Sequence, residues 1–221
     1  MQGIFDRADE LTQELLQEYG ACAQRGEVSE RAKNLFHEVL VKVRSALDFA
    51  MNRIYNVHST LPSKKKTAMA KHVLFPICEQ EKQFSDNLRK YGLSHLEHDE
   101  PDLYRLIRQP QPFATKRNDF LLLRELSNLG KHVQLAVQEC KLQKGKKVTK
   151  QNGSVMKFTE GVTFHRNGIQ VDPSVYGEVQ DVTLASFDIH HGPIKMWEPH
   201  LQCLAFCLSG RRYINKLLAL L

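Results

Sequence analysis

A continuous helical pattern runs through residues 30–56, which read ERAKNLFHEVLVKVRSALDFAMNRIYN. Apolar residues recur there every three or four positions, which places them on one face of a helix. They are Leu35, Phe36, Val39, Leu40, Val43, Ala46, Leu47, Ala50, Met51 and Ile54. Ser29 and Glu30 are suited to open this helix, and we expect it to end near Asn56. A helix with so wide an apolar face is typical of a helical bundle.

Further helices are expected on both sides of this stretch. Residues 4–24 carry leucines and a tyrosine at helical spacing, and Gly20 and Gly26 are expected to mark the exit of that helix. Shorter helices are expected at about residues 80–91 and 100–108. The amino-terminal half of the chain is therefore predicted to be helical.

The pattern changes to short β-like segments between Val133 and Ile189. These segments are rich in β-branched and aromatic residues and are separated by Gly, Asn, Asp and Pro, which favours a small antiparallel sheet. They cover residues 133–137, 155–158, 162–164, 168–171 and 179–187. A last amphipathic helix is predicted from Pro199 to Leu221, and we expect it to return to the bundle.

The predicted fold class is therefore α+β, mainly a helical bundle with a small antiparallel sheet inserted before the C-terminal helix. We expect one domain over residues 1–221. Its parts are the helical bundle (1–132), the β-rich part (133–198) and the returning C-terminal helix (199–221).

Composition bounds the class of protein. The chain has 221 residues, of which 42% are hydrophobic, enough for a sizeable core. Its longest apolar runs are far shorter than the roughly 20 residues that span a bilayer, and no signal peptide is recognisable at its start. Its five cysteines are odd in number and have no disulfide-framework spacing. We therefore expect a cytoplasmic protein with reduced thiols and no membrane partner.

Lysines are concentrated in two places, against a formal net charge of +6. Lys64, Lys65 and Lys66 follow Pro62 in an expected loop, and a second group surrounds Gly145 in an expected turn: Lys141, Lys144, Lys146, Lys147 and Lys150. Such groups attract phosphates without reading sequence. The candidate RNA-binding residues are Lys64, Lys65, Lys66, Lys144, Lys146 and Lys147. The alternative is that both groups are simply solvated.

A polar stripe on the expected helix through residues 122–132 is the candidate catalytic region. Arg124, Asn128 and His132 are four residues apart and drift slowly along one face, with Lys131 beside them. Seven residues separate Arg124 from His132, so these two lie about 12 Å apart along an ideal helix. One phosphate can touch both only if the helix ends near Gly130 or if a second subunit contributes.

The order of several short motifs resembles an uncharacterised bacterial family related to HEPN-type helical-bundle proteins, over nearly the whole chain. The motifs are Arg44-Ser45-Ala46-Leu47-Asp48, Phe75-Pro76-Ile77, Gln111-Pro112-Phe113 and Leu126-Ser127-Asn128-Leu129-Gly130-Lys131-His132. HEPN proteins include metal-independent ribonucleases of toxin and phage-defence systems. Their motif is an Arg and a His on one helix with four to six residues between them, and a dimer brings the groups together. The resemblance implies RNA as a partner, a homodimer and a role in bacterial defence or stress.

In such a ribonuclease His132 would act as general acid or base, because imidazole titrates near neutral pH. Arg124 or Lys131 would stabilise phosphate charge, and Asn128 would orient the imidazole or donate to a phosphate oxygen. Arg44 and Asp48, one turn apart on the long helix, would face the same cleft as supporting residues. The alternative is a buried polar network that fixes how two helices meet, with Asp48 as a structural residue paired to Arg44.

Two function classes therefore stay open: an RNA-binding protein or metal-independent endoribonuclease, and a non-catalytic dimerising interaction or structural module. No cofactor is expected, since no phosphate-cradling or dinucleotide-binding glycine motif occurs. No metal site is expected either. His200, Cys203 and Cys207 have zinc-compatible spacing but alternate with apolar residues, and the group from His95 to Glu100 is treated as surface.

Overall fold

Helix α2 (Glu30–His58) runs through the centre of the helical part. The computed structural model describes residues 2–115, 119–129, 137–150, 155–159, 176–191 and 194–221. All ten residues of the predicted apolar stripe are buried. The Ser29 hydroxyl accepts a hydrogen bond from the Ala32 amide at 3.0 Å, so the predicted N-cap is confirmed. The helix continues two residues beyond Asn56 and is closed by the Ser59 amide, which donates to Tyr55 O.

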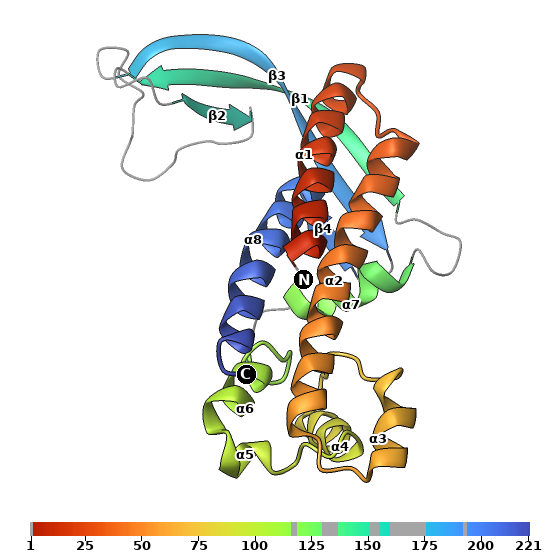
Figure 1. Cartoon of the computed structure of the whole chain (residues 1–221). Coiled ribbons are helices and arrows are strands. Elements are labelled where there is room, and N and C mark those ends of the chain that lie inside the picture. The colour runs from red at the N-terminus through yellow and green to blue at the C-terminus, as the bar shows by residue number, and fades with distance from the viewer. Residues whose placement is uncertain (1, 116–118, 130–136, 151–154, 160–175, 192–193) are drawn as a thin grey trace.

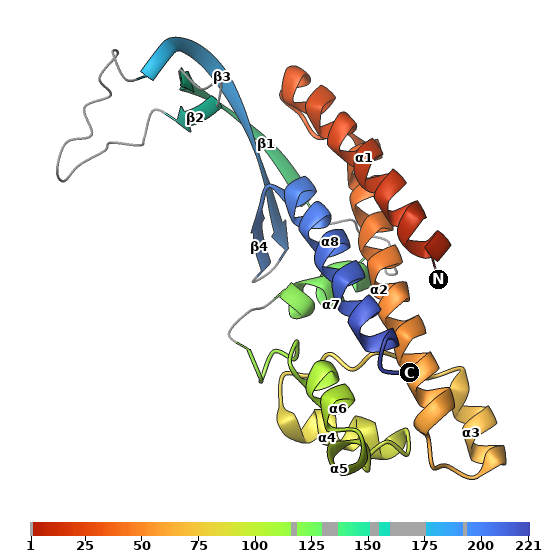
Figure 2. The ribbon, with the colours of Figure 1, turned by 60° about the vertical axis from the view of Figure 1, so that its left-hand side comes forward.

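Helices α1 (Gln2–Arg25) and α8 (Pro199–Leu218) pack beside α2 and against each other (Figures 1 and 2). The predicted return of the C-terminal helix to the bundle is therefore confirmed. The predicted helix over residues 4–24 is confirmed, and it continues through Gly20, with Tyr19 and Cys22 buried on either side. The helix ends at Gly26, whose positive φ of 76° suits a residue without a Cβ.

The described residues also form five shorter helices. They are α3 (Ser63–Ala70), α4 (Glu81–Lys90), α5 (Leu96–Asp99), α6 (Pro101–Arg108) and α7 (Asp119–Leu129). Four of them, α3 to α6, lie around the C-terminal end of α2, and α7 lies beside its middle (Figure 1). The helices predicted at about 80–91 and 100–108 are confirmed as α4 and α6. Within the described ranges, no helix combines the length and the apolar character that crossing a membrane requires.

Helix α3 corrects the prediction that Lys64, Lys65 and Lys66 lie in a loop. The Lys66 ammonium group donates to Asn56 O at 2.9 Å and to Ser59 O at 3.2 Å. Carbonyls at a helix C-terminus carry partial negative charge and lack helical donors, so this cation satisfies the end of α2 and holds α3 against it. The contact joins residues that no periodicity relates.

The sheet has four antiparallel strands in the order β2-β1-β3-β4. They are β1 (Val137–Lys150), β2 (Val155–Thr159), β3 (Tyr176–His191) and β4 (Ile194–Trp197). The strands predicted at 155–158 and 179–187 are confirmed, whereas residues 133–136, 162–164 and 168–171 lie outside the described residues. The fold is thus α+β, mainly helical, with an antiparallel sheet before the C-terminal helix.

Strand β1 corrects the predicted turn at Gly145. Gly145 pairs with Thr159 on one side and with Val182 on the other, so backbone partners on both edges hold this lysine-rich segment extended. Glycine weakens a strand, but two neighbouring strands compensate here. The lysines around Gly145 therefore lie along a strand.

The two ends of the sheet have different surroundings. At its base, Phe187, Ile189 and Met196 are buried and belong to the same hydrophobic core as the helices. Leu142 lies beside Gly26 at the end of α1: a Cβ added at Gly26 would be 3.0 Å from Leu142 Cδ1. Beyond Leu142 the strands continue past the helices (Figures 1 and 2). We call this part the ribbon: residues 143–150 of β1, all of β2 and residues 176–184 of β3.

Replacing Gly20 by alanine is expected to raise the free energy of unfolding by roughly 0.5–1 kcal/mol, because alanine costs less conformational entropy in a helix. Nothing lies within 4 Å of the added Cβ. Gly92→Ala is the contrasting variant: Gly92 has φ +68°, and its Cβ would lie 2.8 Å from Leu61 Cγ. That change is expected to destabilise the fold by about 1–2 kcal/mol. Urea unfolding of both variants tests this, and a stabilised Gly92→Ala protein would contradict it.

Candidate functional site

Arg44 and Asp48 of α2 hold the backbone of the segment that begins at Phe75. Arg44 Nη2 donates to Phe75 O at 2.8 Å, and the Phe75 amide donates to Asp48 Oδ1 at 2.8 Å. The two side chains also form an ion pair at 3.1 Å, so the predicted pairing is confirmed. Burial lowers the pKa of the Arg44 guanidinium; the Asp48 carboxylate opposes this shift, and Arg124 adds to it.

Arg124 of α7 holds the same segment two residues further on. Its Nη1 donates to Ile77 O at 2.9 Å, and its Nη2 donates to Glu79 Oε1 and to Glu125 Oε1, each at 2.7 Å. The pKa of Arg124 is raised: burial, the largest single influence, lowers it, but the hydrogen bonds and charges of the two glutamates together outweigh burial. The guanidinium group thus already donates its hydrogen bonds to acceptors within the protein.

Gln111 completes this arrangement, and the sequence analysis did not single out its side chain. It is 1% exposed, and its Nε2 donates to Pro76 O at 2.7 Å and to Ile107 O at 3.0 Å. Its Oε1 accepts the Cys78 amide at 2.9 Å. The one sequence feature that indicated a structural role for Gln111 was its position between two prolines in an otherwise apolar motif.

Two motifs that carry the family resemblance, together with Arg124, therefore meet on a segment that begins with a third, Phe75-Pro76-Ile77. We call residues 75–79 the clamped segment, because side chains from α2, from α7 and from the turn after α6 hold five of its backbone groups: the amides of Phe75 and Cys78 and the carbonyls of Phe75, Pro76 and Ile77. The arrangement is a set of hydrogen bonds between chain segments that are distant in sequence. It accounts for Arg44, Asp48 and Arg124 without a substrate.

The structure places the remaining candidate catalytic residues only in part. Asn128 is exposed on α7, one turn beyond Arg124. Lys131 and His132 lie outside the described residues. The described residues therefore do not place His132 relative to Arg124. The catalytic assignment of His132, Asn128 and Lys131 stays a prediction.

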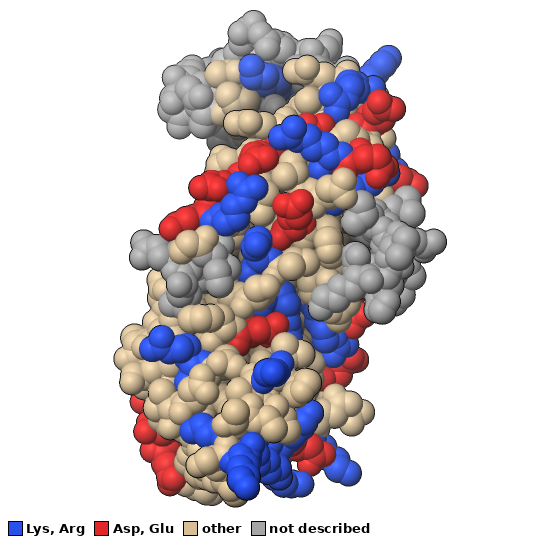
Figure 3. All heavy atoms as spheres, turned by 45° about the vertical axis from the view of Figure 1, so that its right-hand side comes forward, with Lys and Arg blue, Asp and Glu red and all other residues tan. Residues whose placement is uncertain are grey.

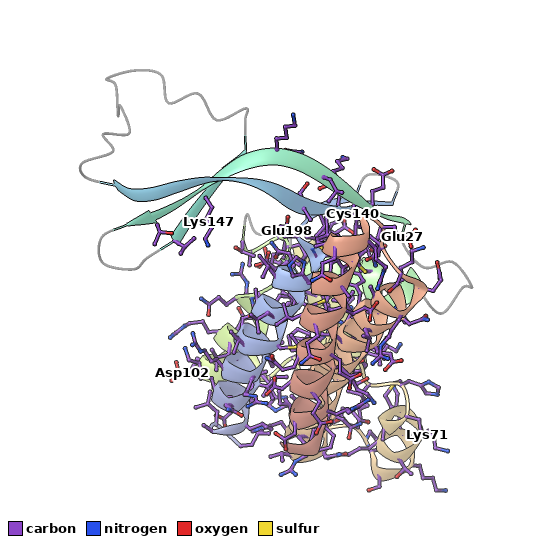
Figure 4. All side chains as sticks on the ribbon, turned by 90° about the horizontal axis from the view of Figure 1, so that it is seen from above. Glu27, Lys71, Asp102, Cys140, Lys147 and Glu198 are labelled. Atoms are coloured by element: carbon purple, nitrogen blue, oxygen red, sulfur yellow. The ribbon has the colours of Figure 1, made fainter. Side chains whose placement is uncertain are left out.

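The lysines of the ribbon form the second candidate site. Residues 141–150 contain five lysines and no acidic residue. Lys144 is exposed and Lys147 is partly exposed, and neither forms an ion pair within the described part of the chain. Lys141, nearer the base, differs because its ammonium group is 2.6 Å from Asp188. Figure 4 shows Lys147 on the ribbon, away from the helices.

Strand register adds to this basic surface. The backbone position of Lys147 pairs with Lys157 of β2, and that of Lys146 pairs with Phe158. On the other side, Lys146 faces Asp181 and Lys144 faces Thr183. By sequence the ribbon contains five lysines against two acidic residues. It is therefore a net positive surface that contains an aromatic position.

Helix α3 and the ribbon lie at opposite ends of the molecule (Figure 1). Lys64 and Lys65 are exposed on α3, whereas Lys66 is engaged with the end of α2. Over the face of the molecule in Figure 3, basic and acidic side chains are interspersed. The two lysine groups of the sequence analysis thus do not form one continuous surface.

The residues with zinc-compatible spacing on α8 are part of the core. Cys203 and Cys207 are buried, and burial raises the pKa of the Cys203 thiol well above its ordinary value. The His200 ring stacks on Tyr19 with 4.7 Å between ring centroids. Within the described ranges, no group of three or more His, Cys, Asp or Glu side chains has a metal-binding arrangement, including the residues from His95 to Glu100.

Two features of the described structure thus remain as functional candidates: the clamped segment with its polar side chains, and the basic ribbon. Comparison of the chain with protein-family models, with curated proteins and with solved structures gave no match. The resemblance to HEPN-type proteins stays a prediction.

Proposed function

We propose that the chain binds RNA through the ribbon, with the helical bundle as its scaffold. The observation that carries the proposal is the part of β1 within the ribbon, residues 143–150, which has four lysines and no acidic residue and extends beyond the helices (Figure 1). Lysines that form no ion pair are available to phosphates, and their binding releases counterions. Because the base of the sheet belongs to the core, the ribbon would be presented in a fixed orientation.

The choice of RNA rests on two further points. The resemblance to HEPN-type proteins implies RNA as the partner, in a bacterial defence or stress system. Phe158 lies at a register position opposite Lys146. Sheets that recognise single-stranded RNA commonly combine basic residues with aromatic rings on which bases stack.

A ribonuclease centred on Arg124 receives less support from the geometry. A phosphate would have to displace the carbonyl of Ile77 or one of two glutamates from this guanidinium. Displacing the Ile77 carbonyl would also release part of the clamped segment, which is costly for a buried backbone group. We therefore propose binding, and cleavage by His132 remains a separate hypothesis.

The test compares two double variants that remove the same charge at opposite ends of the molecule. Lys144→Gln with Lys147→Gln alters the ribbon, and Lys64→Gln with Lys65→Gln alters α3. Affinity for a labelled single-stranded RNA of about 16 nucleotides is measured by fluorescence anisotropy at several salt concentrations. Side chains three residues apart on a strand lie on opposite faces, so an RNA on either face loses one phosphate contact: the salt slope should fall by about 0.7 and the affinity at 0.1 M salt by roughly fivefold.

The α3 variant should keep the parent slope and affinity. Equal losses in both variants would show that net charge and not the ribbon determines binding, and would refute the proposal. Absence of binding by the parent would also refute it, and a dimer in solution would then favour the interaction module. A parallel gel in EDTA with His132→Ala separates binding from cleavage, because only a ribonuclease would shorten the RNA.

A further inference from the structure

A cavity of about 530 Å³ lies between helices α2, α6, α7 and α8. This volume falls within the range of sites for small molecules. Its walls are mainly apolar and come from all four helices: Leu47, Leu106, Phe120, Leu123, Phe206 and Tyr213. The lining residues on α8 run from Phe206 to Lys216. They belong to the C-terminal part of that helix, which lies away from the ribbon (Figure 2).

Two aromatic rings, Phe120 and Tyr213, line one wall of the cavity, and the Phe75 ring packs against both of them. Phe120 and Tyr213 have ring centroids 5.8 Å apart, and both contact Phe75, at 5.9 Å and 6.0 Å. The Tyr213 hydroxyl donates to Leu106 O at 2.7 Å, so its polar atom is already satisfied and its ring remains as apolar surface. Since Phe75 opens the clamped segment, this wall is fixed before any ligand arrives.

Two cations stand at the edge of this apolar space. Arg212 and Lys216 line the cavity one helical turn apart on α8, both are exposed, and within the described residues neither forms an ion pair. The neighbouring Arg211 differs, because it pairs with Asp9 of α1. Asp119 is the one acidic residue among those that line the cavity in the described part of the chain. The lining therefore carries an excess of positive charge.

We propose that this cavity binds a small amphipathic carboxylate, with an apolar body against the aromatic wall and its anionic group toward Arg212 and Lys216. A guanidinium donates two parallel hydrogen bonds to a carboxylate, and the ammonium group one turn later adds a second positive charge. A neutral apolar molecule would use the wall but not the cations. A small hydrophilic anion would use the cations but not the wall.

The experiment uses three probes that separate these contributions: 3-phenylpropionate, its neutral amide, and propionate. Binding to the full chain is followed by titration calorimetry and by ligand-observed NMR. The carboxylate is expected to bind about tenfold more tightly than the amide, the size of one charge-assisted hydrogen bond. Propionate, which lacks the ring, should bind more weakly than both.

Arg212→Gln with Lys216→Gln should abolish the preference for the carboxylate while leaving the binding of the amide unchanged. Both residues are exposed, so the variant should fold. The matched control is Lys64→Gln with Lys65→Gln, which removes the same charge elsewhere and should keep the preference. Equal affinity of parent protein for carboxylate and amide, an equal effect of the control, or no saturable binding of 3-phenylpropionate would overturn the proposal.

Discussion

Replacing Asp48 by alanine is expected to lower the free energy of unfolding by about 3 kcal/mol, because it strands a largely buried cation. The Arg44 side chain is 16% exposed and has Asp48 as its ion-pair partner. The same change removes the acceptor of the Phe75 amide, which lies in the clamped segment. Chemical denaturation monitored by circular dichroism measures the effect.

Two further variants separate the effect of breaking this ion pair from the effect of removing a carboxylate anywhere on the helix. Glu38→Ala removes an exposed carboxylate from the same helix and should change stability by less than about 0.5 kcal/mol. The double replacement Asp48→Asn with Arg44→Met leaves no unpaired charge and keeps a side-chain oxygen that can accept the Phe75 amide, so only the donor to Phe75 O is lost. It should therefore cost less than Asp48→Ala alone. A larger cost for the double variant would refute the stranded-charge explanation.

Replacing Gln111 by methionine is expected to cost about 3 kcal/mol or more, although it preserves side-chain length. Three backbone groups lose their partner at once: the Cys78 amide and the carbonyls of Pro76 and Ile107. Each buried group left without a hydrogen bond costs about 1–3 kcal/mol. The midpoint and slope of urea unfolding measure the change.

Gln109→Met is the matched control, since it makes the same chemical change at an exposed residue of the same turn. It should stay within about 0.5 kcal/mol of the parent. If the two variants had similar stability, the hydrogen bonds of Gln111 would not hold the clamped segment. A smaller cost for Gln111→Glu is not expected, because a carboxylate cannot donate to the two carbonyls unless it is protonated.

The sequence predicted the elements whose stability comes from an amphipathic pattern. The apolar stripe of α2 is buried throughout, and α8 packs against the bundle as predicted. Its buried side chains include Cys203, Cys207 and Ile214, whereas Leu201 and Leu208 are exposed. The sequence did not predict α3, which has no buried residue and no apolar stripe, and whose place depends on Lys66 reaching the end of α2. The sequence also predicted a turn at Gly145, because local propensity does not reveal that two neighbouring strands pair with this residue.

Several residues of the candidate site could be predicted from the sequence, but the contacts between them could not. Arg44 and Asp48 are one turn apart on one helix, so their pairing followed from helical spacing. The partners of Arg124 and Gln111 on the clamped segment lie more than thirty residues away in the chain, at Ile77 and Cys78, and no spacing rule encodes such contacts. For that reason Arg124 suggested a phosphate ligand from sequence, whereas the structure gives it carbonyl and carboxylate partners.

The clamped segment bears on how kinship with other chains should be judged. Its anchors come from two of the short motifs that carry the family resemblance and from Arg124, which are widely separated in sequence, yet each anchor serves to fix the same few peptide groups. Selection for a stable fold alone would preserve such motifs together, whatever the chain does in the cell. Another protein that carries them in this order would share an architecture, and its chemistry would have to be inferred from its remaining surfaces.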